Sequence, residues 1–258
     1  MGQLDDAYAN GAYIANGAAY PGLWAARAAA FRAGARGRPD QPYGPRARER
    51  FDLFLPVGPP LGTVVFVHGG YWLEGDKSLW SHLAAGPVAR GWAVAVPSYD
   101  LCPTVRIADI TRQVALAIAV IADRLPGPLR LCGHSAGGHL VARMACDDLT
   151  PDWRRRVQRI VPISALSDLA PLMQTGMNAV LRLDRAEARA ESPVLLGWSG
   201  VPVTLWVGAD ERPAFLDQSR RLSARWQVPV VVEPGRHHFD VIEGLSDPRS
   251  PLTATLLG

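Results

Sequence analysis

The residues with the clearest chemical potential lie in the sequence Gly-His-Ser-Ala-Gly at positions 133–137. An apolar segment at 129–132 precedes them, and a helical stretch that begins with small residues follows. A strand, a sharp turn and a helix in this order expose a serine hydroxyl at the carboxyl end of the strand. Small neighbours are needed because other backbone approaches closely there, and the helix adds partial positive charge near the reacting centre. The pattern therefore predicts that Ser135 is a nucleophile that attacks a carbonyl carbon.

A serine hydroxyl is a poor nucleophile until a base takes its proton, so a carboxylate and then a histidine should follow Ser135 along the chain. Asp210 comes just after a β-branched segment, and His238 comes shortly after the next one. The adjacent residues Glu211 and His237 are rival candidates, because the distance from the preceding strand does not separate them. We predict Asp210 as the orienting carboxylate and His238 as the base.

The histidines near the C-terminus do not form a recognisable metal motif. A site built on His237, His238 and Asp240 would need further ligands, and none is apparent in the sequence. His134 and His139, which flank the serine, are interpreted as packing residues. We therefore expect neither a metal nor a cofactor.

A second glycine pair follows an earlier β-branched segment. Gly69 and Gly70 come directly after it, and Tyr71 and Trp72 come next. Glycines at such a position let two backbone N–H groups point at one oxygen, which stabilises a developing oxyanion. We expect Gly69, Gly70 and Ala136 to supply these donors. Tyr71 and Trp72 are expected at the wall of the substrate pocket, and the hydrophobic core is the alternative place for either ring.

These residues need a scaffold that brings the ends of several strands together. From about residue 51 onward, short β-branched runs alternate with helical patterns, which predicts an α/β fold with a mostly parallel central sheet and helices on both faces. The runs at 63–67 and 203–207 lack a clean polar alternation, so we expect them to be central strands. The predicted strands are 51–55, 63–67, 92–96, 129–132, 160–163, 203–207 and 230–233.

The chain length fits a single domain over residues 1–258. About 40 residues separate the strands that end near 163 and begin at 203, more than one crossover helix needs, so we expect a small cap insertion at about 165–198. Residues 1–48 are interpreted as an N-terminal helical extension. Two interpretations explain its aromatic side chains equally well. Its helices cross the mouth of the domain, or they form an extension without a role in the site.

Composition excludes several classes of protein. Hydrophobic residues make up 48% and charged residues 20% of the chain, which is typical of a folded globular protein and not of a disordered one. The formal net charge is only +3, and the densest basic run, at 154–156, lacks interleaved aromatic residues. We therefore expect no nucleic-acid partner. We also expect no membrane partner, because the longest apolar helical run is far shorter than the roughly 20 residues of a membrane span.

The cysteines and the N-terminus bear on the compartment. Cys102, Cys132 and Cys146 are odd in number and lack the close pairing of metal or redox motifs. Asp5 and Asp6 stand where a signal peptide would carry positive charge. We expect reduced thiols and a cytoplasmic protein with a small-molecule substrate. The oligomeric state stays open, with a homodimer among the states considered.

Several motifs together resemble the arylformamidase, or kynurenine formamidase, group of α/β-hydrolases. The elbow around Ser135 and the order of the triad belong to the whole superfamily. The HGGYW motif at 68–72 and the PSYDLCP motif at 97–103 point to this group in particular. The resemblance spans most of the chain, and it favours His238 over His237 because the base directly precedes a phenylalanine. The motifs are HGGYW at 68–72 with GDKS at 75–78, PSYDLCP at 97–103, RLDRAEARAESP at 182–193, and HFD at 238–240.

The resemblance implies hydrolysis of a small ester or an activated amide, with N-formylkynurenine or another aryl formamide as the specific candidate. A bulky Trp72 beside the oxyanion hole would restrict the acyl side to a group as small as formyl or acetyl. The alternatives are a short-chain carboxylesterase or thioesterase, and a non-catalytic ligand-binding protein on the same fold.

Overall fold

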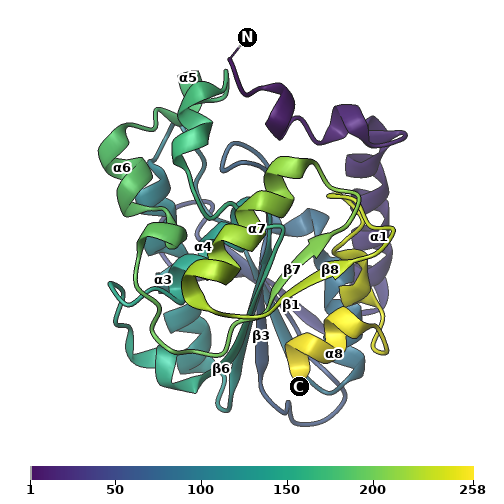
Figure 1. Ribbon diagram of the computed structural model, residues 1–258. Coiled ribbons are helices and arrows are strands. Elements are labelled where there is room, and N and C mark those ends of the chain that lie inside the picture. The colour runs from purple at the N-terminus through teal and green to yellow at the C-terminus, as the bar shows by residue number, and fades with distance from the viewer. Residues whose placement is uncertain (1) are drawn as a thin grey trace.

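The computed structural model describes residues 2–258, and within them it has one eight-stranded sheet in the order β1-β2-β4-β3-β5-β6-β7-β8 (Figure 1). β3 to β8 are parallel to one another, whereas β2 runs antiparallel to both of its neighbours. The strands are β1 (Gly37–Pro42), β2 (Arg50–Phe54), β3 (Thr63–Val67), β4 (Ala93–Pro97), β5 (Leu129–His134), β6 (Val157–Ile163), β7 (Leu205–Gly208) and β8 (Val230–Glu233).

The side chains of β3 alternate between two hydrophobic cores. Val65 and Val67 pack into the core on one face of the sheet, and Val64 and Phe66 pack into the core on the other. This explains why the strand lacks polar residues, and it confirms the central place predicted for residues 63–67. The same expectation for residues 203–207 is wrong. β7 is covered on both faces but lies next to the edge strand β8.

Helices cover both faces of the sheet (Figure 1). α3 (Ile107–Arg124), α4 (Ala136–Met144) and α7 (Pro213–Trp226) contribute to the first core, and α1 (Tyr20–Gly34), α2 (Ala85–Ala89) and α8 (Pro251–Leu257) pack against the second. The mostly parallel sheet with helices on both faces is therefore confirmed. The remaining short 3-10 helices outside the N-terminal segment are η4 (Lys77–Leu79), η5 (Ser81–Ala84), η6 (Asp152–Arg156), η7 (Ala170–Gln174), η8 (Pro193–Leu195) and η9 (Glu243–Ser246).

The long connection between β6 and β7 forms a small helical insertion. It contains α5 (Asn178–Leu181) and α6 (Arg185–Ala190), together with η7 and η8. Arg106, just before α3, makes an ion pair of 2.5 Å with Glu187 of α6, which ties the insertion to the side of the domain. Buried Glu191 accepts a hydrogen bond of 2.6 Å from Thr111 of α3 and fixes the end of the insertion.

The N-terminal segment crosses the top of the molecule from α5 to α1 in Figure 1. It contains η1 (Asp6–Tyr8), η2 (Gly11–Tyr13) and η3 (Gly17–Ala19). The Leu4 N–H donates to the Gln174 carbonyl at 3.2 Å, which joins the segment to the insertion. Residues 37–42 lie within the stretch interpreted as a helical extension, but they form the edge strand β1. The segment thus begins over the sheet ends and finishes in the sheet itself.

Three further observations concern the described part of the chain. Among residues 2–258, the helices are too short or too polar to cross a lipid bilayer. The same residues contain no group of His, Cys, Asp and Glu side chains that could hold a metal ion. The three cysteines are buried and free of disulfide bonds.

Candidate active site

Ser135 occupies the sharp turn between β5 and α4 in a backbone conformation that is rare for a residue with a side chain. Its φ and ψ angles are 55° and −116°. A Cβ atom on Gly137 would lie 2.0 Å from the Val67 carbonyl oxygen, and one on Gly133 would lie 2.3 Å from the Gly137 oxygen. Both positions therefore require glycine, and the close packing that they allow holds the serine in its strained turn.

The carboxylate beside His238 is Glu211. Its Oε2 atom lies 2.6 Å from Nδ1 of His238, and the two side chains are 0% and 4% exposed. Its other oxygen accepts hydrogen bonds from the Ser164 hydroxyl at 2.5 Å and the Gly208 N–H at 2.8 Å. These bonds satisfy the oxygens of a carboxylate that would otherwise be costly to bury in an apolar interior.

The prediction of Asp210 as the orienting carboxylate is corrected by this geometry. After β7 the chain turns so that residue 210 faces solvent and residue 211 faces the interior. The Asp210 N–H donates to the Arg236 carbonyl at 2.9 Å, which fixes the backbone in this orientation. The longer side chain of Glu211 then reaches the Gly208 N–H and His238.

The geometry also separates the two adjacent histidines. His238 is 3% exposed, and Phe215 packs against its ring with centroids 4.3 Å apart. Because its Nδ1 is engaged by Glu211, Nε2 is the ring nitrogen left to serve a serine hydroxyl. His237 instead forms a hydrogen bond of 3.0 Å with the Tyr20 hydroxyl and contacts Asp240. The arrangement favours His238 as the base, as the resemblance implied.

His134 links the nucleophile turn to the base. Its Nε2 lies 2.8 Å from the backbone oxygen of His238. Burial, together with the nearby His238, lowers the pKa of His134 well below its usual value, so the ring stays neutral. A neutral ring that donates from Nε2 is the form that satisfies this carbonyl. His134, which the sequence suggested as a packing residue, thus also anchors the backbone of His238.

The loop after β3, which is expected to form the oxyanion hole, is held by contacts of His68 and Tyr99. Nδ1 of His68 lies 2.8 Å from the Gly69 carbonyl oxygen, and burial lowers the pKa of His68 to about 4. Since a trans peptide directs its C=O and N–H to opposite sides, this contact turns the Gly70 N–H away from His68. Tyr99 stacks on His68 with centroids 4.3 Å apart and donates to its backbone oxygen at 2.8 Å. The PSYDLCP segment therefore supports the HGGYW loop.

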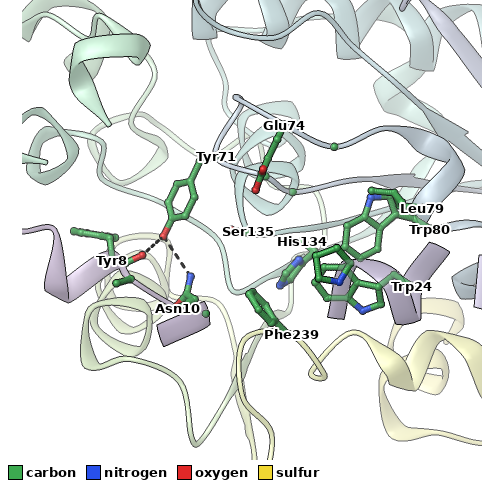
Figure 2. Close-up of a pocket in the computed structure, with 16 residues that line it drawn as sticks. Tyr8, Asn10, Trp24, Tyr71, Glu74, Leu79, Trp80, His134, Ser135 and Phe239 are labelled. Atoms are coloured by element: carbon green, nitrogen blue, oxygen red, sulfur yellow. Dashed lines mark hydrogen bonds between the residues drawn. The ribbon is translucent and has the colours of Figure 1, made fainter. Parts of the chain in front are cut away.

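The serine opens into a cavity of about 360 Å³, which lies within the usual range of small-molecule sites (Figure 2). Gly69 and Gly70 line it together with Ser135 and His134. Ala136 is the first residue of α4, where a backbone N–H lacks an intrahelical partner. The predicted donors therefore belong to the loop and the helix end that flank the serine. The rest of the wall is Tyr8, Ala9, Asn10, Gly11, Pro21, Trp24, Tyr71, Glu74, Gly75, Leu79, Trp80 and Phe239.

The sequence and the fold have known relatives, although no family model matches the chain. The kynurenine formamidase of Salmo salar is 29% identical over 84% of this chain and 79% of its own length. A crystal structure of a Silicibacter sp. TM1040 protein, proposed to be a thioesterase, is 52% identical, covers 100% of both chains and has a TM-score of 0.98. The chain belongs to the kynurenine formamidase-like group of the α/β-hydrolases.

More distant structures share the fold alone. An esterase of Pyrobaculum calidifontis is 19% identical, covers 92% of this chain and 90% of its own, and has a TM-score of 0.68. The relatives of higher identity, and not these structures, identify the chain as a hydrolase of the α/β-hydrolase family, as the motifs implied.

The two aromatic residues after the glycine pair of this hydrolase have different places. Tyr71 lines the cavity, and its hydroxyl donates to the Tyr8 carbonyl at 2.6 Å and accepts from Asn10 at 3.3 Å (Figure 2). Trp72 is 0% exposed, does not line the cavity and packs edge-on against His139 at 5.1 Å. The expectation that Trp72 limits the acyl group is therefore wrong. Its side chain points into the first core.

The N-terminal segment of the hydrolase, and not the insertion between β6 and β7, forms the outer wall of the site. Tyr8, Asn10 and Trp24 all line the cavity, whereas none of its lining residues comes from 165–198. This wall favours the interpretation in which the helices of residues 1–48 cross the mouth of the domain. The aromatic residues near the N-terminus are the sequence feature that indicates this wall. Because they lie far from Ser135 along the chain, the sequence does not show which of them reach the cavity.

Proposed function

We propose that this hydrolase removes a small acyl group from an ester or an activated amide, and that its preferred substrate is an aryl formamide such as N-formylkynurenine. The observation that carries the proposal is the buried His238–Glu211 pair beside the strained Ser135 turn. A carboxylate that orients a histidine next to a serine hydroxyl is the arrangement that activates a serine nucleophile. Relatives named kynurenine formamidase support the choice of a formamide.

In the proposed reaction, the Ser135 oxygen attacks the formyl carbon while Nε2 of His238 accepts its proton. Glu211 holds the ring in the required tautomer and stabilises its positive charge. The backbone N–H groups of Gly69, Gly70 and Ala136 receive the negative oxygen of the tetrahedral intermediate. When the C–N bond breaks, His238 gives its proton to the departing nitrogen. Water then attacks the formyl ester by the same steps and releases formate.

An aryl formamide suits such a site because its leaving group is unusually good for an amide. The nitrogen lone pair is shared with the aromatic ring, so the carbonyl is more electrophilic than in a peptide and the departing amine is less basic. A serine hydrolase with esterase-like machinery can therefore cleave it with one general acid.

The cavity wall agrees with an aromatic leaving group. Trp24 and Trp80 lie against each other with ring centroids 4.6 Å apart, and Phe239 lies 5.3 Å from Trp24. All three line the cavity, and Figure 2 shows the two tryptophans side by side. A flat ring gains dispersion and apolar burial when it packs against such side chains.

A short-chain carboxylesterase or thioesterase is the second candidate. It is favoured by the Silicibacter protein proposed to be a thioesterase, which is 52% identical over its full length. The same Ser135 chemistry would serve an ester or a thioester. The non-catalytic alternative predicts that a member of the triad is missing, and the presence of Ser135, His238 and Glu211 together argues against it.

The test compares kcat/KM of the purified protein on N-formylkynurenine and on p-nitrophenyl acetate. The formamide proposal predicts efficient release of formate from the first compound. Turnover of the acetate with a negligible rate on the formamide would instead favour the esterase, and would contradict the formamide proposal.

A further inference from the structure

The cavity beside Ser135 has an uneven distribution of charge. Its wall contains one carboxylate, Glu74, and neither lysine nor arginine. The other polar side chains of the wall are one amide, three hydroxyls, two indoles and the buried His134, all of them neutral. An anionic group, such as the carboxylate of N-formylkynurenine, would thus find no cation in this wall, whereas a cationic group, such as the ammonium of the same molecule, would find one counter-charge.

We propose that Glu74 is a specificity residue that binds an organic ammonium group of the substrate and selects cationic over neutral substrates for Ser135. This inference rests on the proposed function, because it assumes that Ser135 hydrolyses the bound molecule. It adds a substrate class, a small acyl derivative with a positive charge on the leaving-group side.

The backbone of Glu74 is held close to Gly70, because it closes the turn that begins there. Its backbone N–H donates to the Gly70 carbonyl at 3.1 Å. Gly70 has a φ of 109°, and a Cβ atom there would lie 2.3 Å from the Glu74 carbonyl oxygen. The predicted oxyanion donor and the carboxylate therefore belong to one tight loop. Figure 2 shows the Glu74 side chain between Tyr71 and Trp80.

The carboxylate of Glu74 is not used by the fold. Within residues 2–258 it has neither an ion-pair nor a hydrogen-bond partner within the usual distances. The nearby guanidinium of Arg48 donates instead to the carbonyls of Gly75 and Tyr99, at 2.6 and 2.7 Å. Asp76, two residues on, is different: it accepts from the Ser78 N–H and the Ser98 hydroxyl, both at 2.9 Å, and caps η4. Asp76 is structural, whereas Glu74 is available to a ligand.

Aromatic rings complete a site for an organic cation. Trp24 and Trp80 line the same cavity, and the faces of tryptophan rings attract ammonium groups. Glu74 is exposed at the cavity mouth, so solvent weakens its attraction for a cation. We therefore expect a moderate preference and not an absolute requirement for the charge.

The experiment uses two thioesters that differ in charge and hardly in shape: acetylthiocholine and S-(3,3-dimethylbutyl) thioacetate. For the wild-type protein, kcat/KM is expected to be about three- to tenfold higher for the cationic ester at low salt. Glu74→Gln is expected to lower this ratio to near one. Asp123→Asn removes an equal charge from the exposed side of α3 and should keep the ratio. An unchanged ratio in Glu74→Gln would overturn the inference.

Binding provides a second measurement that needs no turnover. Calorimetry should show that choline binds the wild-type protein more tightly than 3,3-dimethylbutan-1-ol does, and that Glu74→Gln removes the difference. Equal affinities in the wild-type protein would overturn the inference. A charge preference that depends on Glu74, combined with no turnover of N-formylkynurenine, would contradict the formamide proposal alone.

Discussion

Nδ1 of His238 lies 2.6 Å from Oε2 of Glu211, in an interior that leaves the carboxylate side chain fully covered. The neighbouring carboxylate, Asp210, faces solvent. Of these two adjacent residues, Glu211 is placed to orient the His238 ring and Asp210 is not.

Glu211→Gln is predicted to lower kcat on a p-nitrophenyl ester by about 10³-fold, because the amide no longer stabilises the protonated His238 and favours the wrong tautomer. Asp210→Asn is the matched control and should stay within a few-fold of the wild-type rate. Steady-state kinetics at one pH, with circular dichroism to verify folding, measures both. A large loss in Asp210→Asn with a small one in Glu211→Gln would reverse the assignment.

The sequence predicted the scaffold better than the direction of individual side chains. Seven strands lie close to their predicted ranges because their sequences are short, mostly apolar runs separated by helical or turn-forming segments. β1 was missed because its residues are exposed and include Pro39 and Pro42, which is typical of an edge and not of a core strand. The choice between Asp210 and Glu211 depends on the rotation of one turn after β7, which residue types do not encode.

Trp72 illustrates the same limit. The glycine pair before it indicates a loop at the site, but the residues after the loop turn into the core, where Trp72 is 0% exposed. Trp72→Ala is therefore predicted to lower the free energy of unfolding by about 3–5 kcal/mol, as truncation of a buried tryptophan does. Trp198→Ala, at a position 37% exposed, should cost clearly less in the same urea titration. Equal losses would contradict the buried position of Trp72.

Tyr71 is predicted to act by holding the N-terminal wall of the cavity. Tyr71→Phe removes the hydroxyl that bonds the Tyr8 carbonyl and Asn10, so residues 8–10 become less well ordered beside the substrate. We expect KM to rise by about three- to tenfold with little change in kcat, since each lost hydrogen bond is worth roughly 1 kcal/mol. Tyr13→Phe, at an exposed residue outside this cavity, is the control. A fall in kcat at constant KM would contradict a role in binding.

The stability of the protein should depend on pH through its buried histidines. Burial lowers the pKa of His82 to about 4, from a usual value near 6.5, and His68 is lowered in the same way. Between these values the unfolded chain binds protons that the folded chain does not. The free energy of unfolding should therefore be highest above pH 6.5 and fall as the pH falls toward 4, by about 1.4 kcal/mol per pH unit for each such histidine.

His82→Leu tests this dependence away from the active site. Glu243, 4.0 Å from His82, has a pKa that burial raises, so its contribution has the opposite sign, and it is present in both proteins. Urea unfolding at pH 7.5, 6.0 and 5.0 should give a shallower pH dependence for the variant. The same slope in both proteins would exclude His82 as a source of the effect.

Labelling with a fluorophosphonate tests the central claim most directly, because it reports the reactivity of one serine without assuming a substrate. Intact-protein mass spectrometry of the wild-type protein should show a single adduct, and peptide mapping should place it on Ser135. The adduct should be absent in Ser135→Ala and form more slowly, by about 10²-fold or more, in Glu211→Gln. An inert wild-type protein, or labelling that persists in Ser135→Ala, would contradict the account.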